Sequence, residues 1–306
     1  MSALSPASKK PLSDCTVAIA GLGLMGGSLG LALQGQVARV IGIARRRETL
    51  QQALAIGAIH AGCETLAAGA AEADVVVLAT PVGVVLEQVA ELGRLAAAGA
   101  LRPGLVLLDL GSTKAQVCQA MAGLPPGVEP VGGHPMCGKE TSGLDVAEAR
   151  LYEGAPFVLT PLPRTAPWAL DLARSLVVAV GARPIEMGAE RHDRLVAAIS
   201  HLPYVLSLAL FAAVEDVAAE DEMVWQLAAG GFRSTTRLAG SDVTMMLDIL
   251  LTNRDNVLKL IEGLRCRLDG LAQALDADNR AALRFQAERI RGLRADFLER
   301  YGNGAR

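Results

Sequence analysis

The chain of 306 residues lacks the features that mark nucleic-acid-binding proteins. Its formal net charge is −3, so it has no basic excess with which to neutralise phosphates. Aromatic residues make up only 3% of the sequence, too few for a platform on which bases stack. We therefore expect no nucleic-acid partner.

Cysteine and histidine are also sparse. The five cysteines are scattered and odd in number, which argues against a disulfide framework. The four histidines are dispersed as well, so the sequence predicts no metal site. These residues are Cys15, Cys63, Cys118, Cys137 and Cys266, and His60, His134, His192 and His201.

No segment carries a convincing targeting or membrane signal. Residues 1–13 are small and polar and lack the apolar core of a secretory signal, so we expect a disordered leader there. The run Leu195–Val214 has no formal charge and is long enough to span a membrane. It is broken by His201 and Pro203, and a lone span would leave the freed backbone groups without partners. We expect a buried helix in a cytoplasmic protein with no membrane partner.

What the sequence does contain is apolar residues, at 51% of the chain, and enough length for about two domains of roughly 150 residues each. Between residues 14 and 187, short aliphatic runs alternate with helical stretches, which predicts a parallel sheet covered on both faces. From residue 188 onward the pattern is helical, most clearly over Asn253–Leu275 and Ala281–Tyr301. The expected strands are Thr16–Ala20, Arg39–Ala44, Asp74–Thr80, Leu105–Leu110, Glu129–Gly133, Pro156–Thr160 and Ala182–Glu186.

The first expected strand runs into a GxGxxG motif. Gly21 permits a tight turn, Gly23 lets a pyrophosphate approach the backbone, and Gly26 lets the following helix pack closely on the strand. The N–H groups at the start of that helix favour an anion. This pattern predicts a doubly wound, Rossmann-type dinucleotide site. Its expected cofactor-binding residues are Gly21, Leu22, Gly23, Leu24, Met25 and Gly26, with Ala44, Arg45 and Arg46 at the end of the second strand and Thr80 and Pro81 at the end of the third.

The end of the second strand lacks the acidic residue that usually binds the ribose 2′-hydroxyl of NAD. Ala44 stands there, followed by Arg45, Arg46 and Arg47. A guanidinium suits a 2′-phosphate, because it forms two parallel hydrogen bonds with it. We therefore expect NADP as the preferred cofactor, with NAD also used. The alternative is that these arginines only form a solvated start to the next helix.

Four further motifs follow in order: Asp109–Lys114 (DLGSTK), Gly132–Gly138 (GGHPMCG), Ser200–Pro203 (SHLP) and Gly231–Arg237 (GFRSTTR). Together with GxGxxG, the chain from about residue 17 to 256 resembles the prephenate/arogenate dehydrogenases of tyrosine biosynthesis. The resemblance implies an NAD(P)-dependent oxidative decarboxylation of a small cyclohexadienol, and a helical domain through which a homodimer forms. We expect the Rossmann domain at residues 14–187 and the helical substrate and dimerisation domain at 188–306.

The expected chemistry is a hydride transfer coupled to loss of a hydroxyl proton, and a neutral imidazole is a natural acceptor for that proton. We expect His134 to be this base and Ser112 to orient the hydroxyl or the imidazole. Arg237 resembles the arginine with which the family binds a substrate carboxylate. Further substrate-binding candidates are His201, Arg233, Lys139 and Tyr204, and less strongly Lys114. Tyr204 departs from the family, because several relatives have a histidine directly after SHLP.

Three alternatives stay open. Prephenate is the expected substrate, but arogenate, which carries an amino group in place of the keto group, is the second possibility. Another Rossmann-plus-helical reductase, such as an imine reductase or β-hydroxyacid dehydrogenase, would typically need a catalytic lysine or aspartate on the first helix of its second domain. A dinucleotide-sensing protein without activity would have no reason to retain His134, Ser112 and Arg237 together.

Overall fold

The computed structural model of the chain describes residues 10–139 and 141–302. They belong to two compact units, Met1–Arg254 and Asp255–Arg306. Residues 1–9 of the expected leader lie outside the described residues. Disorder does not extend to residues 10–13, because Lys10 forms a 2.6 Å ion pair with Asp74 and Leu12–Asp14 is a short 3-10 helix.

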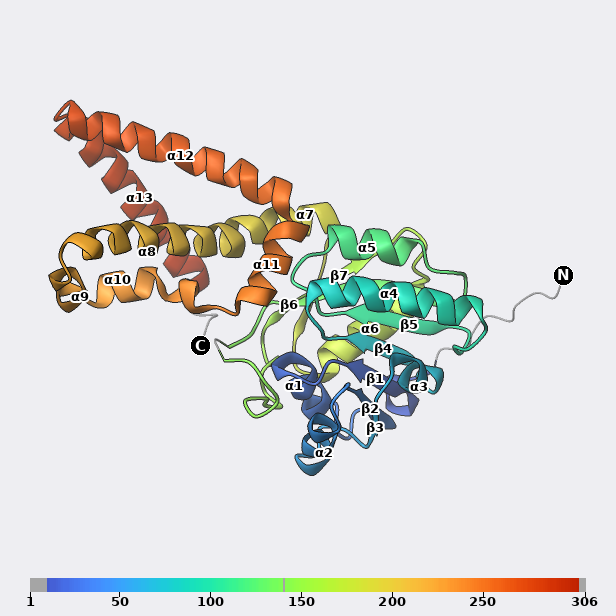
Figure 1. Cartoon of the computed structure of the whole chain (residues 1–306). Coiled ribbons are helices and arrows are strands. Elements are labelled where there is room, and N and C mark those ends of the chain that lie inside the picture. Colours follow the sequence, from blue (N-terminus) through green and yellow to red (C-terminus); the bar gives the residue numbers. More distant parts are fainter. Residues whose placement is uncertain (1–9, 140, 303–306) are drawn as a thin grey trace. The chain divides into compact units, whose positions relative to one another are not determined.

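The first unit contains one eight-stranded sheet in the order β3-β2-β1-β4-β5-β6-β7-β8 (Figure 1). All seven expected strands are confirmed to within a few residues, and β3 is an addition that its short sequence, Ala-Gly-Cys, did not reveal. Strand order reverses beside β1, which pairs with both β2 and β4. The strands are β1 (Thr16–Ala20), β2 (Arg39–Ile43), β3 (Ala61–Cys63), β4 (Val75–Leu78), β5 (Leu105–Asp109), β6 (Val128–Pro135), β7 (Pro156–Pro161) and β8 (Arg183–Glu186).

Helices cover both faces of this sheet. Alternate residues of the central strands enter two separate apolar clusters, as the two-residue period of a strand requires. Val17 and Ile19 of β1 pack with Leu29 on one face, and Ala18 and Ala20 lie on the other. The helices of this α/β region are α1 (Leu24–Ala32), α2 (Arg47–Ala55), α3 (Leu66–Ala71), α4 (Val82–Ala97), α5 (Ala115–Ala122) and α6 (Pro167–Ala179).

The expectation of an all-parallel sheet is wrong at one pair of strands. β6 and β7 are antiparallel, with His134 opposite Val158 and Pro135 opposite Phe157. A parallel pair needs a crossover connection, usually a helix, and the described part of the segment between β6 and β7 contains no helix. As a result β6 continues through Pro135, and His134 lies on the strand rather than in a loop after it.

The helical part of the first unit begins with one long helix, Ala189–Glu220, which is long and apolar enough to cross a membrane. It comprises α7 (Ala189–Val196), a π-helical turn at Ala197–His201, and α8 (Leu202–Glu220). Pro203 explains the irregular turn, since it has no N–H to donate to the preceding turn. The remaining elements of this part are α9 (Met223–Leu227), α10 (Gly230–Thr235), the 3-10 helix Arg237–Gly240 and α11 (Val243–Thr252).

The long helix is less buried than we expected. Only 28% of its most apolar window lies inside the structure, and Leu206, Leu208 and Phe211 are each about 40% exposed. The helix is therefore not a core helix of the single chain. Large exposed apolar side chains of this kind are typical of a face that another protein surface covers.

Two carboxylates join the helical part to the sheet. Asp193 of α7 accepts hydrogen bonds from the backbone N–H groups of Lys114 and Ala115, at the start of α5. Asp248 of α11 accepts one from the N–H of Gly83, at the start of α4. These contacts lie within the first unit, which extends to Arg254.

The second unit consists of α12 (Arg254–Asp276), which starts at the boundary, and α13 (Arg280–Tyr301). The two expected C-terminal helices are thus confirmed. Asp278 adopts a positive φ of 46° between them, and the side chain of Asn279 caps α13. Both helices carry exposed apolar residues, among them Leu268, Leu275, Phe285, Ile290, Leu293 and Phe297.

Candidate active site

The GxGxxG turn has the form that a dinucleotide requires. Gly21 has a φ of +97°, and a Cβ on it would lie 2.7 Å from the carbonyl oxygen of Ala79. A Cβ on Gly26 would collide with the carbonyl of Gly21, whereas one on Gly23 would meet nothing within 4 Å. The space in front of Gly23 is where a pyrophosphate would approach. Gly23 is also the N-cap of α1 and supplies no capping side chain, so the first N–H groups of the helix suit an anion.

The other expected cofactor residues follow the ends of neighbouring strands. Ala44 comes directly after β2, and Arg45 and Arg46 behind it are exposed. Arg47 is engaged instead by Glu64, at 2.6 Å. Thr80 and Pro81 follow β4, where the Thr80 hydroxyl donates to Gln88 at 2.7 Å. These residues all lie at the carboxyl ends of β1, β2 and β4, where dinucleotides bind in open α/β sheets.

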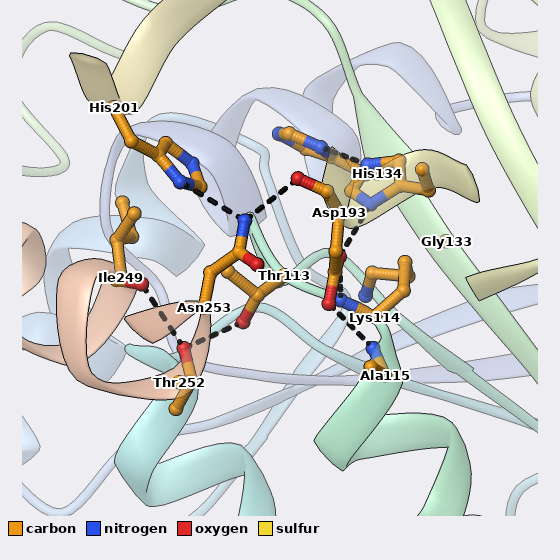
Figure 2. Close-up of polar contacts among 12 residues, drawn as sticks. Thr113, Lys114, Ala115, Gly133, His134, Asp193, His201, Ile249, Thr252 and Asn253 are labelled. Carbon is orange, nitrogen blue, oxygen red and sulfur yellow. Dashed lines mark hydrogen bonds and ion pairs between the residues drawn. The ribbon is translucent and has the colours of Figure 1, made fainter. Parts of the chain in front are cut away.

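His134 lies on β6, near the same edge of the sheet. Its Nδ1 is 2.8 Å from Nε2 of His192, and the two rings meet edge to face at 71°. Nδ1 of His192 is in turn 2.8 Å from Oδ1 of Asp193. We call these three side chains the His–His–Asp network. Figure 2 shows His134 and Asp193 among the surrounding polar contacts.

The network is anchored on the start of α5. Oδ1 of Asp193 accepts the N–H of Lys114 at 2.7 Å and Oδ2 accepts that of Ala115 at 2.8 Å. His192 and Asp193 are almost fully buried, whereas His134 keeps partial exposure. The one open end of the network is therefore the His134 ring.

Burial lowers the pKa of His134 well below its ordinary value of 6.5, and the nearby His192, Lys114 and His201 lower it further. Removing an imidazolium from water is unfavourable, and the positive charge of Lys114 opposes a further charge nearby. The ring of His134 is therefore uncharged at neutral pH, which is the form that a general base needs.

The structure places Lys114, a weaker substrate candidate from the sequence, inside the protein. It is fully buried and its ammonium forms an ion pair with Asp109, which is equally buried. Asp109 also accepts hydrogen bonds from the N–H groups of Gly111 at 2.8 Å and Gly133 at 3.1 Å. The pair therefore ties the loop after β5 to β6, next to His134.

His201 belongs to the same polar cluster. The amide of Asn253 donates to its Nδ1 at 3.2 Å and to the backbone carbonyl of Asp193 at 2.7 Å (Figure 2). Burial lowers the pKa of His201 to about 4, against an opposing effect of Asp193. His201 is thus a neutral, oriented imidazole close to the network.

Among the described residues, no hydrogen bond or ion pair joins the other candidates from the sequence to the His–His–Asp network. Ser112 is half-buried in the loop after β5, and no hydrogen bond joins its hydroxyl to another described residue. Tyr204 is buried against Met246 and Ile249. The remaining candidates lie toward the surface: Lys139 pairs with Glu148 at 3.1 Å, Arg233 is exposed on α10, and Arg237 is exposed at the start of its 3-10 helix.

His192, Asp193 and Asn253 are site residues that the sequence analysis missed. They lie about 80 to 140 residues beyond Lys114 along the chain, and no fixed spacing connects them to the loops that they contact. The available signal was weak: a His-Asp pair on the apolar face of the helix that leads into SHLP. Within residues 10–139 and 141–302, no group of three or more His, Cys, Asp or Glu side chains is arranged to hold a metal ion.

A glycine-turn nucleotide site beside a partly exposed, neutral histidine defines the class of Rossmann dehydrogenases. Comparison with known proteins identifies the family. The chain matches the family model "Prephenate dehydrogenase, nucleotide-binding domain" over residues 29–186 and "Prephenate dehydrogenase, dimerization domain" over residues 188–286. It therefore belongs to the prephenate dehydrogenase family, as the sequence motifs indicated.

Individual relatives agree. The chain is 37% identical to the prephenate dehydrogenase of Bacillus subtilis over 79% of its own length and 65% of that enzyme. Its structure superposes on prephenate dehydrogenase from A. aeolicus, solved with hydroxyphenyl propionate and NAD+, with a TM-score of 0.86 and 29% identity, over 94% of this chain and 100% of the other. Arogenate dehydrogenase from Synechocystis gives a TM-score of 0.78 and 28% identity, over 92% and 99%.

These findings confirm the Rossmann fold with a helical C-terminal part, the oxidoreductase class of the relatives, and NAD(P) as the type of cofactor. The chain spans a little less than two thirds of the length of the B. subtilis enzyme. Its own substrate, its choice between NAD and NADP, and its assembly are taken up below as proposals.

Proposed function

We propose that this protein catalyses the NAD(P)-dependent oxidative decarboxylation of prephenate to 4-hydroxyphenylpyruvate. The observation that carries this proposal is the partly exposed, uncharged His134 on β6, held at Nδ1 by His192 and lying at the carboxyl edge of a dinucleotide-binding sheet. Bound NAD(P)+ supplies the hydride acceptor, and the protein supplies position and proton transfer.

In this reaction His134 accepts the proton of the ring hydroxyl at Nε2, the nitrogen that faces away from His192. The carbon that bears this hydroxyl loses its hydride, and the hydroxyl oxygen becomes a carbonyl. Breaking the bond to the ring carboxylate then releases CO2 and leaves an aromatic ring. The ring oxygen takes back the proton from His134, so no net proton is released. Aromatisation favours this step.

The substrate is a dianion, and we propose that Arg237 binds one of its carboxylates, since a guanidinium pairs with a carboxylate through two parallel hydrogen bonds. His201 and Ser112 are proposed to contact the substrate at the ring. Arg233 and Tyr204 are weaker candidates. Lys139 has less support, because Glu148 and the carbonyl of Val146 already engage its ammonium.

The experiment is an absorbance assay of reduced cofactor, crossing prephenate and arogenate with NAD and NADP. Turnover of prephenate with formation of 4-hydroxyphenylpyruvate is the expected result. Turnover of arogenate alone would replace prephenate by the second candidate substrate. No turnover of either compound, with normal cofactor binding, would leave a dinucleotide-binding protein of another kind.

For the cofactor we propose a preference for NADP. Ala44 cannot bond to a ribose 2′-hydroxyl, and the exposed guanidinium of Arg45 follows it directly. Arg47 already pairs with Glu64, so Arg45 and Arg46 are the better candidates for the 2′-phosphate. Both nucleotides share the pyrophosphate that the glycine turn suits, so NAD remains a substrate.

We propose that the protein works as a homodimer built on its helical part. The exposed apolar face of α8 would be left in water in a single chain, at a cost of roughly 25 cal/mol for each Å². A matching family model for a dimerization domain over residues 188–286 supports this assembly.

We also propose that the enzyme is cytoplasmic. The only helix among the described residues with the length and composition of a membrane span is Ala189–Glu220. The same helix carries His192 and Asp193, whose polar contacts join it to β6 and to the start of α5. This helix therefore serves the site, and the exposed part of it suits a second copy better than lipid.

A further inference from the structure

The catalytic proposal requires a lone pair on Nε2 of His134, and a neutral imidazole offers one only when its proton lies on the other nitrogen. Nδ1 of His134 faces Nε2 of His192 at 2.8 Å, so one of these two nitrogens donates to the other. If His192 donated, His134 would carry its proton on Nε2 and could not accept another. The hydrogen bonds behind His192 decide between these two arrangements.

Asp193 is an unprotonated carboxylate in this arrangement. Both of its oxygens accept backbone N–H groups, Oδ1 from Lys114 and Oδ2 from Ala115. These groups open α5, and the positive end of a helix dipole favours a negative charge there. A carboxylate of this kind can only accept hydrogen bonds.

The donors of the network follow by elimination. Nδ1 of His192 lies 2.8 Å from Oδ1 of Asp193 and must donate to it. With a single proton on its ring, His192 has its lone pair on Nε2, so Nδ1 of His134 donates to His192. The lone pair of His134 is left on Nε2, at the open end of the network.

The backbone of the same residue fixes a second imidazole in the opposite form. The Asn253 amide nitrogen donates to the carbonyl of Asp193 at 2.7 Å and to Nδ1 of His201 at 3.2 Å. His201 therefore accepts at Nδ1 and, being neutral, carries its proton on Nε2. One ring is left as an acceptor and the other as a donor.

We infer that Asp193 is the positioning residue of this active site: through His192 it fixes His134 as a proton acceptor, and through Asn253 it fixes His201 as a hydrogen-bond donor. The role of His134 as the base rests on the function proposed above. The assignment of the two tautomers does not, since it follows from hydrogen bonds within the protein.

This arrangement predicts which substrate atoms the two rings meet. His134 faces a group that loses a proton, the ring hydroxyl. His201 is suited to an acceptor, either a carboxylate or a carbonyl oxygen, and it presents no positive charge to it because it is neutral. After proton transfer, the charge on His134 is stabilised by its hydrogen bond to His192, which the Asp193 carboxylate holds in turn.

The direct test is the 15N NMR spectrum of the full-length protein with labelled histidine, recorded above pH 6.5. The chain has only four histidines, so single His→Gln variants assign the signals. We expect a pyridine-like Nε2 and a pyrrole-like Nδ1 for His134, and the reverse for His201. A pyrrole-like Nε2 on His134 overturns the inference, even if the enzyme turns over prephenate. This measurement needs no substrate, so it is independent of the proposed function.

Kinetics test the same assignment through the variants Asp193→Asn, His192→Gln and His192→Leu. An amide at position 193 can donate to His192 and so reverse the tautomers of His192 and His134. A base held in the wrong tautomer loses up to about 10⁴-fold in kcat. We expect Asp193→Asn to lower kcat by about 100-fold or more while KM changes by less than about threefold. His192→Gln keeps an oxygen that can accept from His134, so it should retain at least about tenfold more activity than His192→Leu.

The matched control is Asp248→Asn. Asp248 also caps a helix of the sheet from the helical part, at Gly83, but it contacts no imidazole. If Asp193 acts only as a structural cap, the two Asn variants will lose stability and kcat alike, and His192→Gln will be no better than His192→Leu. Either result would overturn the inference. Loss of kcat confined to Asp193→Asn, at similar thermal midpoints, supports it.

Discussion

The carboxylate of Asp248 accepts a hydrogen bond from the backbone N–H of Gly83 at 2.9 Å, although 165 residues separate the two along the chain. Gly83 lies in the first turn of α4, where backbone N–H groups have no partner within the helix. Asp193 does the same for α5. Both helices start at the carboxyl edge of the sheet, so the two carboxylates place the helical part directly over the proposed active site.

Asp248→Ala should lower the free energy of unfolding by about 1 kcal/mol, the usual effect of losing a helix cap. Asp248→Asn should lower it less, because the amide oxygen still accepts. Urea denaturation at a fixed protein concentration measures both, since assembly would otherwise shift the midpoint. An Asp248→Ala variant as stable as the wild type would show that water replaces this cap without loss.

His134→Asn should lower kcat by about 100-fold or more, the usual effect of losing a general base, because no lone pair is left to accept the hydroxyl proton. Cofactor affinity should hardly change, since His134 lies outside the glycine turn. Steady-state kinetics and a cofactor titration measure the two effects separately. Near wild-type turnover would remove His134 from the mechanism.

Stability should fall as the pH falls from 6.5 to 4, and His201 should contribute to this. An unfolded histidine takes up a proton near pH 6.5, whereas the folded His201 does so only near pH 4. Between these values the unfolded state binds more protons, so acid favours unfolding, by up to about 1.4 kcal/mol per pH unit for each such group. His134 acts with the same sign, because its pKa is also lowered.

The check is the free energy of unfolding as a function of pH for the wild type and His201→Gln. The variant loses one group that titrates in this window, so its slope should be smaller, whatever its absolute stability. Equal slopes for the two proteins would mean that His201 is not held neutral in the folded state.

Local patterns in the sequence predicted the glycine turn and the helix that follows it. A strand, a GxGxxG turn and a helix occupy consecutive residues, and each glycine has a steric reason that the structure bears out at Gly21 and Gly26. His134 could be recognised in the same way, because it follows a glycine pair at the end of an apolar run. The signal for each of these residues comes from its neighbours in the sequence.

The His–His–Asp network could not be predicted from the sequence, because its residues come together only in the folded chain. Asp193 becomes meaningful only when α7 packs against the start of α5, and Asn253 only when the end of α11 meets the π-helical turn at Ala197–His201. Tertiary packing, which no local spacing encodes, decided both.

Light scattering at micromolar concentration should give a mass near twice 31.8 kDa. The reason is the apolar face of α8, where Leu206, Leu208 and Phe211 are each about 40% exposed in the single chain. Replacing Leu208 by Glu would place a charge in this face and should shift the mass toward the monomer. The exposed Leu54→Glu, on α2 of the α/β region, is the control that should leave the mass unchanged. An active wild-type monomer would contradict the homodimer.

Arg45→Ala should abolish most of the preference for NADP. The two cofactors differ by one phosphate on the adenosine ribose, and Arg45 follows Ala44 at the end of β2 with an exposed guanidinium. A charge-assisted hydrogen bond contributes about 1.5–3 kcal/mol, or roughly 10- to 150-fold in affinity. We expect kcat/KM for NADP to fall by about that factor, with little change for NAD.

The matched control is Arg47→Ala, since the Arg47 guanidinium is already paired with Glu64 at 2.6 Å. This variant should keep the wild-type ratio of kcat/KM for NADP over NAD. A ratio lost equally in both variants would indicate a diffuse effect of positive charge instead of a contact with the phosphate. A wild-type enzyme that prefers NAD would refute the interpretation of Ala44 and Arg45. The glycine turn and the chemistry at His134 would be unaffected, because neither involves the 2′ position of the ribose.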